Sequence, residues 1–212
     1  MFASLPLQER WFVRGRMLTA PLARVAALAP AGRILDVGCG HGALMALLAV
    51  ERPDREVTGI DPDPRKVAWA AASVGRLANA RVLQGIAETL LPDREQGFDA
   101  VVIADVLYLL PRARWEAFLI AAFRLLAPGG QLLLQEAEGD GSWRHLKWLL
   151  QETLMVRVLR RTRASGGLQL EPRAVTEALL GRAGFVEVEA TSMSAGYTTP
   201  HLFIRARRPP RV

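Results

Sequence analysis

One short stretch, Ile34 to Gly42, constrains the fold more than any other part of the chain. It reads Ile-Leu-Asp-Val-Gly-Cys-Gly-His-Gly, an apolar strand that runs into a glycine-rich turn. Glycines at this spacing permit positive φ angles and remove the side chains that would keep a ligand away from the backbone. A helix is predicted to begin near Ala43, and its free N–H groups point at the same turn. The stretch therefore predicts a cradle for a nucleotide-like cofactor.

An acidic residue at the end of this strand, Asp36, separates the turn from an ordinary dinucleotide site. The glycines satisfy a loose dinucleotide-binding pattern and do not decide which cofactor binds. A carboxylate here repels a pyrophosphate, whereas it attracts the ammonium and sulfonium of S-adenosylmethionine (SAM). Asp61 follows a second apolar run, about 20 residues beyond the last glycine, where a carboxylate accepts both ribose hydroxyls in either cofactor class. Asp36 thus favours a cationic donor over a nicotinamide dinucleotide.

Four motifs occur along the chain in a fixed order. They are Leu35 to Gly42, Gly59 to Asp63, Phe98 to Leu107, and Leu125 to Leu132. Together they resemble the class I SAM-dependent methyltransferases of small-molecule type, over roughly residues 32–207. The resemblance implies one doubly wound, mostly parallel seven-stranded α/β sheet with helices on both faces and an antiparallel C-terminal strand. It also implies SAM as cofactor and S-adenosylhomocysteine (SAH) as product.

The pattern of apolar runs predicts the same alternation of strands and helices. Strands are expected over residues 56–60, 81–84, 98–104, 131–136, 185–189 and 201–207, and helices over 43–50, 64–77, 112–126 and 172–184. Ligands bind such sheets at the carboxyl ends of the strands, where the strand order reverses. Polar or small residues lie at the predicted strand ends, namely Asp36, Asp61, Gly85, Asp105 and Glu136.

The predicted methyltransferase domain spans residues 31–208, between an N-terminal helical segment, 1–30, and a tail, 209–212. Pro21 is expected to divide the N-terminal segment into two short helices. The resemblance implies that this segment forms a lid over the active site, and packing against the sheet is the alternative. A basic amphipathic helical insertion is expected over residues 143–161, either as a solvated outer face or in contact with a membrane surface.

Composition bounds the partners and the location. Half of the 212 residues are hydrophobic, enough for one substantial core. The net charge is +6, but only two of the 27 basic residues are lysine, and this arginine bias, typical of GC-rich genomes, weakens the inference of a nucleic-acid partner. Cys39 is the single cysteine, and no uncharged run reaches the ~18 residues of a membrane span. We therefore expect a cytoplasmic protein of undetermined oligomeric state.

The resemblance assigns the expected cofactor contacts. Asp36 would organise the ammonium and Asp61 the ribose diol. The remaining expected cofactor-binding residues are Gly38, Cys39, Gly40, Gly42, Pro62, Gly85, Ile86, Ala87, Ala104 and Asp105. Ile86 departs from the family pattern, because many members have an acidic residue there that accepts from the adenine amino group. Glu88 is the expected substitute.

Catalytic residues are harder to predict. Methyl transfer is an in-line displacement in which alignment and exclusion of water do most of the catalysis. The candidates for proton abstraction are Tyr108, Glu136 and His145, with Tyr197 and His201 as further alternatives. Glu136 is expected to face the substrate cleft and has no evident structural task. No metal is predicted, since the available carboxylates lack a diagnostic spacing.

The leading interpretation is a SAM-dependent methyltransferase that acts on oxygen, nitrogen or carbon of a small biosynthetic molecule. Three alternatives stay open: a lipid or prenyl-linked acceptor at a membrane surface, a non-catalytic SAM-binding module, and a nicotinamide-dependent oxidoreductase. A nucleic-acid acceptor is not favoured, because residues 104–107 lack the Asn/Asp-Pro-Pro-aromatic tetrapeptide that grips an extruded base.

Overall fold

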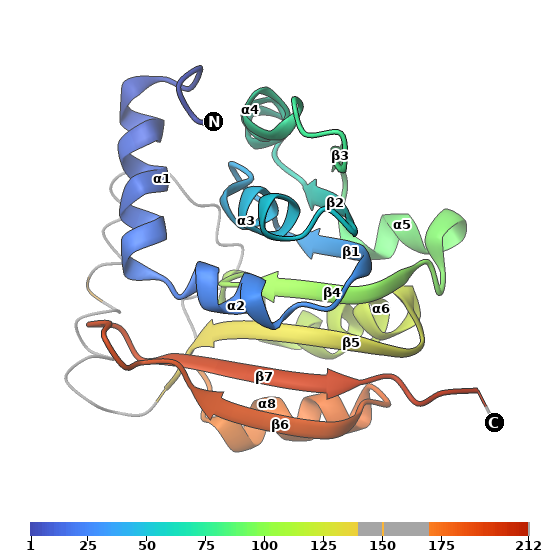
Figure 1. The fold of residues 1–212 in the computed structure, drawn as a ribbon. Helices are drawn as coiled ribbons and strands as arrows, with labels where there is room; N and C mark the ends of the chain where they lie inside the picture. Colours follow the sequence, from blue (N-terminus) through green and yellow to red (C-terminus); the bar gives the residue numbers. More distant parts are fainter. Residues whose placement is uncertain (140–149, 151–169, 212) are drawn as a thin grey trace.

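A sheet of seven strands lies at the centre of the structure (Figure 1). The computed structural model describes residues 1–139, 150 and 170–211, and the strand order is β3-β2-β1-β4-β5-β7-β6. The strands are β1 (Gly32–Val37), β2 (Arg55–Asp61), β3 (Ala80–Gln84), β4 (Phe98–Ala104), β5 (Leu126–Ala137), β6 (Val186–Ser192) and β7 (His201–Arg207). The first five run parallel, and β7 is antiparallel to both β5 and β6. The predicted fold class is confirmed.

Helices cover both faces of this sheet (Figure 1). They are α1 (Leu7–Thr19), α2 (Leu22–Leu28), α3 (Ala43–Glu51), α4 (Pro64–Val74), α5 (Ala87–Arg94), α6 (Trp115–Leu125) and α8 (Arg173–Arg182), with 3₁₀ helices η1 (Leu107–Leu109) and η2 (Arg112–Arg114). Side chains alternate across β1, so Ile34 packs with α2 and α3 whereas Leu35 packs with α6. The two resulting cores hold the strand ends at fixed positions.

The predicted elements agree with the observed ones apart from a few boundaries and one helix. The expected break at Pro21 separates α1 from α2. The helix predicted over residues 112–126 begins as η2 and continues as α6. α5 was not predicted, and it contains Pro92, a residue that is unfavourable inside a helix because it lacks an N–H. The insertion predicted at 143–161 lies outside the described residues.

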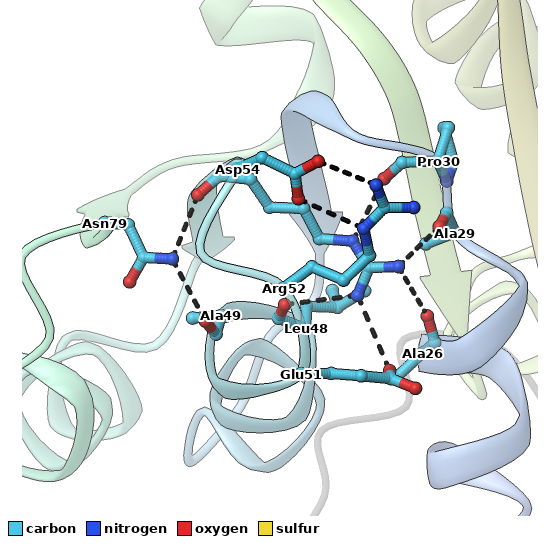
Figure 2. A network of polar contacts seen from close by, with 10 residues as sticks. Ala26, Ala29, Pro30, Leu48, Ala49, Glu51, Arg52, Asp54 and Asn79 are labelled. Carbon is cyan, nitrogen blue, oxygen red and sulfur yellow. Dashed lines mark hydrogen bonds and ion pairs between the residues drawn. The ribbon is translucent and has the colours of Figure 1, made fainter.

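A buried arginine fastens the N-terminal segment to the domain. Arg55 is 1% exposed. Its guanidinium donates to the carbonyl oxygens of Ala26 at 3.0 Å, Pro30 at 3.0 Å and Leu48 at 3.2 Å, and also to that of Ala29. Figure 2 shows these carbonyl-bearing residues gathered around one point. Carbonyls at helix C-termini lack partners within the helix, so Arg55 supplies donors to the ends of both α2 and α3.

No described helix is both long enough and apolar enough to cross a bilayer.

Candidate functional site

A cavity of about 440 Å³ opens at the carboxyl ends of β1, β2 and β4. It is bounded by the glycine-rich turn, the residues that follow β2, η1, and one side of α1. β1 lies between β2 and β4, the point at which the strand order reverses. Open α/β sheets bind ligands at this point, and the volume suits a small molecule. The sequence therefore predicted the location of the cavity correctly.

The glycine-rich turn needs glycine for two reasons. Gly38, Gly40 and Gly42 have φ angles of +75°, +56° and +80°, values that strain other residues. In addition, a Cβ on Gly38 would lie 2.5 Å from Val106 Cγ2. The N–H of Gly38 donates to the carbonyl of Ile60 at 2.8 Å, which fixes the turn against β2. The backbone is thus open to a ligand from the cavity side.

Asp61 joins the glycine turn to the end of β2. Its Oδ2 accepts the N–H of Gly40 at 3.0 Å, and its Oδ1 accepts the N–H of Asp63 at 2.9 Å. Asp63 in turn caps α4 by accepting the N–H of Arg65 at 2.9 Å. Each carboxylate oxygen has a second lone pair. Asp61 can therefore keep both bonds and still accept two hydroxyl donors.

Asp36 is a buried carboxylate at the cavity wall. Its Oδ2 has no hydrogen-bond partner among the described residues. Burial, together with the nearby charge of Asp61, raises its pKa from 3.8 to about 7, although Arg16 and the backbone N–H of Met45 act in the opposite direction. A buried acceptor atom without a donor is costly. The site therefore fits a ligand that brings a cationic donor such as an ammonium.

Asp105, directly after β4, lies between the cavity and a polar chain of residues. It has a φ of +55°, an uncommon value for a residue other than glycine. Its N–H donates to the carbonyl of Gln135 at 2.8 Å, and its Oδ1 accepts from Gln135 Nε2 at 3.1 Å. Arg16 Nη2 on α1 forms an ion pair with Asp105 Oδ2 at 2.5 Å. These contacts hold the strained residue in place.

The polar chain continues from Gln135 to the last strand. Gln135 Nε2 lies 3.2 Å from His201 Nδ1, and His201 Nε2 lies 2.9 Å from the carbonyl oxygen of Thr19. Because a carbonyl only accepts, we assign the proton to Nε2, and Nδ1 then accepts from Gln135. Burial lowers the pKa of His201. His201 thus connects β7 to the end of α1, and Tyr197 packs edge-on against its ring. Neither of these two lines the cavity.

The other end of α1 is attached to the glycine turn. His41 Nε2 lies 3.0 Å from Glu9 Oε2, and the His41 ring stacks on Trp69 with centroids 5.1 Å apart. Burial lowers the pKa of His41 against the opposing effect of Glu9. Glu9 and Arg16 are two helical turns apart on one face of α1, and the residues between them, Phe12 and Val13, line the cavity. The sequence did not predict the contacts of this face, although the helical spacing of Glu9, Phe12, Val13 and Arg16 places them on one side of the helix.

The predicted catalytic residues fall in different places. Tyr108 on η1 is buried and lines the cavity. Glu136 does not line the cavity, and it does have a structural task, because its Oε1 accepts the N–H groups of Val106 and Leu107. The expectation that Glu136 faces the cleft was therefore wrong. His145 lies outside the described residues. Catalytic roles for all three stay predictions.

The expected cofactor residues divide into two groups. The group that lines the cavity is Asp36, Gly38, Cys39, Gly40, Asp61, Pro62, Ala104 and Asp105. The group that does not is Gly42, Gly85, Ile86 and Ala87. Gly42 packs toward Ala70 and Val74, and the N–H of Ile86 is bound to Thr89 Oγ1 at 3.1 Å. Glu88, the expected adenine acceptor, pairs with Arg114 at 2.9 Å.

Comparisons with known proteins agree with this geometry. Residues 34–130 match a family model described as a methyltransferase domain. The chain is 34% identical to a trans-aconitate 2-methyltransferase of Methylobacterium radiotolerans, over 84% of this chain and 67% of the relative. It is 33% identical to a fatty-acid O-methyltransferase of Mycolicibacterium smegmatis, over 50% of this chain and 37% of the relative. Other matches include methyltransferases named for a release factor and for ribosomal RNA.

Among solved structures, the SAM-dependent methyltransferase SibL in its apo form is similar, with a TM-score of 0.72 and 25% identity. That match covers 98% of this chain and 61% of SibL. The chain spans about two thirds of the trans-aconitate relative and little more than a third of the fatty-acid relative.

Proposed function

The chain belongs to the class I SAM-dependent methyltransferases, and from this premise we propose that it transfers a methyl group to a carboxylate oxygen of a small organic acid. SAM is its cofactor. Bound SAM supplies a methyl group activated by the sulfonium, and SAH is the product. The protein has to bind the donor, align the acceptor and exclude water.

The residues at the strand ends suit the donor. We assign the ammonium to Asp36, whose Oδ2 has no partner among the described residues, and the ribose diol to Asp61. The glycine turn offers backbone without side chains beside them. Two carboxylates close to the cavity also favour a donor with positive charge over a pyrophosphate.

The observation that carries the choice of acceptor is the position of Arg16. Arg16 lines the cavity together with apolar and aromatic residues, among them Phe12, Tyr108, Leu109 and Leu110, and its Nη2 pairs with Asp105. A guanidinium offers five N–H donors in a planar fork that matches a carboxylate. A partly apolar wall that also carries Arg16 and Lys66 suits a molecule that has both a hydrocarbon part and an acid group.

The chemistry of a carboxylate acceptor also agrees with the side chains present. Such a group is already ionised at neutral pH, so its oxygen attacks without losing a proton. Such an acceptor needs no general base. His41, which lines the cavity, is already bound to Glu9 and stacked on Trp69. The relatives named for trans-aconitate and for fatty acids support the same class of acceptor.

Two experiments test this function in order. Calorimetry should show that SAM and SAH bind and that NADH does not. If only NADH bound, the assignment of SAM as the cofactor would be wrong. Tritiated methyl transfer from SAM is then measured with trans-aconitate, fatty acids of increasing length, catechols and amines. Methyl esters release tritiated methanol in alkali, whereas ethers and methylamines do not. Label that survives alkali would contradict a carboxylate acceptor, and binding without transfer to any acceptor would indicate a binding module.

A further inference from the structure

The first three N–H groups of the loop that follows β4 all donate to residues of β5. The N–H of Asp105 donates to the carbonyl of Gln135 at 2.8 Å. The N–H groups of Val106 and Leu107 both donate to Glu136 Oε1, at 2.9 Å and 2.8 Å. One carboxylate oxygen therefore orients two successive amides at the beginning of η1.

Glu136 is placed to do this from behind the cavity. Successive residues of a strand face opposite sides of the sheet, so Glu136 points away from the side on which Gln135 contacts Asp105 and His201. Its side chain is buried, and its Oε2 has no hydrogen-bond partner among residues 1–139, 150 and 170–211. Glu136 is thus bonded to the backbone at the start of η1 and is not among the residues that line the cavity.

The position of this loop sets the shape of the cavity. Val106 lies against the backbone of Gly38, where an added Cβ would be 2.5 Å from its Cγ2. Tyr108, one residue beyond the bonded amides, forms part of the cavity wall. A shift of η1 would move the Val106 side chain relative to the glycine turn and Tyr108 relative to the acceptor.

We propose that Glu136 is a positioning residue for methyl transfer, which holds Val106 and Tyr108 in register with the glycine turn through its bonds to the two amides. This inference rests on the proposed function in that the cavity binds donor and acceptor. It differs from a role in proton abstraction, because it requires a hydrogen-bond acceptor at Oε1 and no exchange of protons with substrate. When a change far from the reacting atoms misplaces an aligned group by about 1 Å, the rate can fall on the order of 100-fold.

The chain has two tyrosines, Tyr108 and Tyr197, which allows a direct test. Protein labelled with 3-fluorotyrosine should give two ¹⁹F resonances, and Tyr197→Phe identifies the one from Tyr108. Spectra are recorded with and without SAH for the unchanged protein, Glu136→Gln and Glu136→Met. The Gln variant keeps an oxygen that accepts from both amides, whereas the Met variant fills the space without an acceptor. Leu180→Ala, a core change on α8, serves as the control for lost stability.

In Glu136→Met we expect a shifted or broadened Tyr108 resonance, faster hydrogen exchange at residues 106–107 and, with any acceptor that is found, a kcat lowered at least 30-fold while the KM for SAM changes less than threefold. Glu136→Gln should restore the resonance and most of the rate, and Leu180→Ala should leave Tyr108 unchanged. An unchanged Tyr108 resonance and exchange in Glu136→Met would overturn the proposal, as would a Gln variant that behaves like Met. Absence of SAH binding by the unchanged protein would instead count against the proposed function.

Discussion

Arg16 Nη2 on α1 lies 2.5 Å from Asp105 Oδ2 at the end of β4, so the N-terminal helix and a central strand meet in an ion pair at the cavity. The Asp105 side chain is 4% exposed and that of Arg16 is 29% exposed. The contact is therefore neither a surface pair nor a fully buried one. It attaches the helix to a residue that already has an unusual backbone conformation.

Removing the charge of Arg16 should loosen α1. In Arg16→Gln the nearly buried Asp105 loses its counter-charge. We expect the free energy of unfolding to fall by about 1–2 kcal/mol, a loss between those typical of exposed and of buried ion pairs. Hydrogen exchange in α1 should rise. Urea unfolding and exchange mass spectrometry measure both. Arg14→Gln, an exposed arginine on the same helix, is the matched control, and equal effects of the two changes would show that the ion pair contributes nothing.

The affinity for SAH should depend on the ionisation of Asp36. Its pKa is raised to about 7, and only the anionic form attracts the ammonium. Binding should therefore be about 10-fold tighter at pH 8 than at pH 6, with proton release near neutral pH. Calorimetry in buffers of different ionisation enthalpy measures this. Asp36→Asn should bind more weakly and lose the pH dependence, and a variant that retains it would assign the effect to another group.

Asp36 should also make the ligand-free protein less stable as pH rises. Its folded pKa is above its unfolded value of 3.8, so the folded state holds the proton more tightly. Between about pH 4 and pH 7 the unfolded state has released that proton while the folded state has not, and the contribution of Asp36 to the free energy of unfolding falls across this window. Urea titrations from pH 4.5 to 7.5 should show a weaker fall in Asp36→Asn. Parallel curves for the two proteins would contradict the shift.

Arg55 should be one of the most sensitive positions in the fold. Arg55→Met leaves helix C-terminal carbonyls buried without donors, and we expect a loss of about 3–5 kcal/mol in the free energy of unfolding. Arg52→Met is the control, because Arg52, labelled in Figure 2, pairs with Asp54 at the surface. Thermal and urea unfolding of both variants should separate them clearly. A stability similar to that of Arg52→Met would mean that water replaces the guanidinium.

Gly38→Ala and Gly129→Ala separate backbone strain from collision. Both glycines have similar φ angles, +75° and +79°, but a Cβ on Gly129 meets nothing within 4 Å whereas one on Gly38 meets Val106. We expect about 1–2 kcal/mol of destabilisation for Gly129→Ala and a larger loss, with weaker SAH binding, for Gly38→Ala. Differential scanning calorimetry and SAH titration provide the comparison. Equal losses with intact SAH binding would show that Val106 moves aside freely.

Local patterns were enough to predict the sheet, because each strand is an apolar run bounded by turn residues. The cavity followed from Asp36, Asp61 and the glycines, since parallel strands bring their carboxyl ends to one edge. Boundaries shifted where a 3₁₀ turn precedes a helix, as at Arg112 to Arg114. The outcome for Glu136 could not be foreseen, because its partners are amides some 30 positions away in sequence.

The contacts of α1 show the same limit. Glu9 and Arg16 lie seven positions apart on a helix that faces the cavity, and they contact His41 and Asp105, which lie far from them in the sequence. Helical spacing alone indicates that the two share a face. It does not indicate that His41 and Asp105 lie opposite them, because the positions of those two residues depend on the packed sheet.

The bond between His201 and the Thr19 carbonyl joins residues that are 182 positions apart. The ribosome releases α1 well before β7, because α1 precedes β7 in the sequence. The end of α1 is therefore synthesised early, but its bond to His201 can form only after β7 has been added beside β5. Premature termination between Leu132 and His201 would yield a chain with all four donor motifs but without the strand to which the N-terminal helix is bonded.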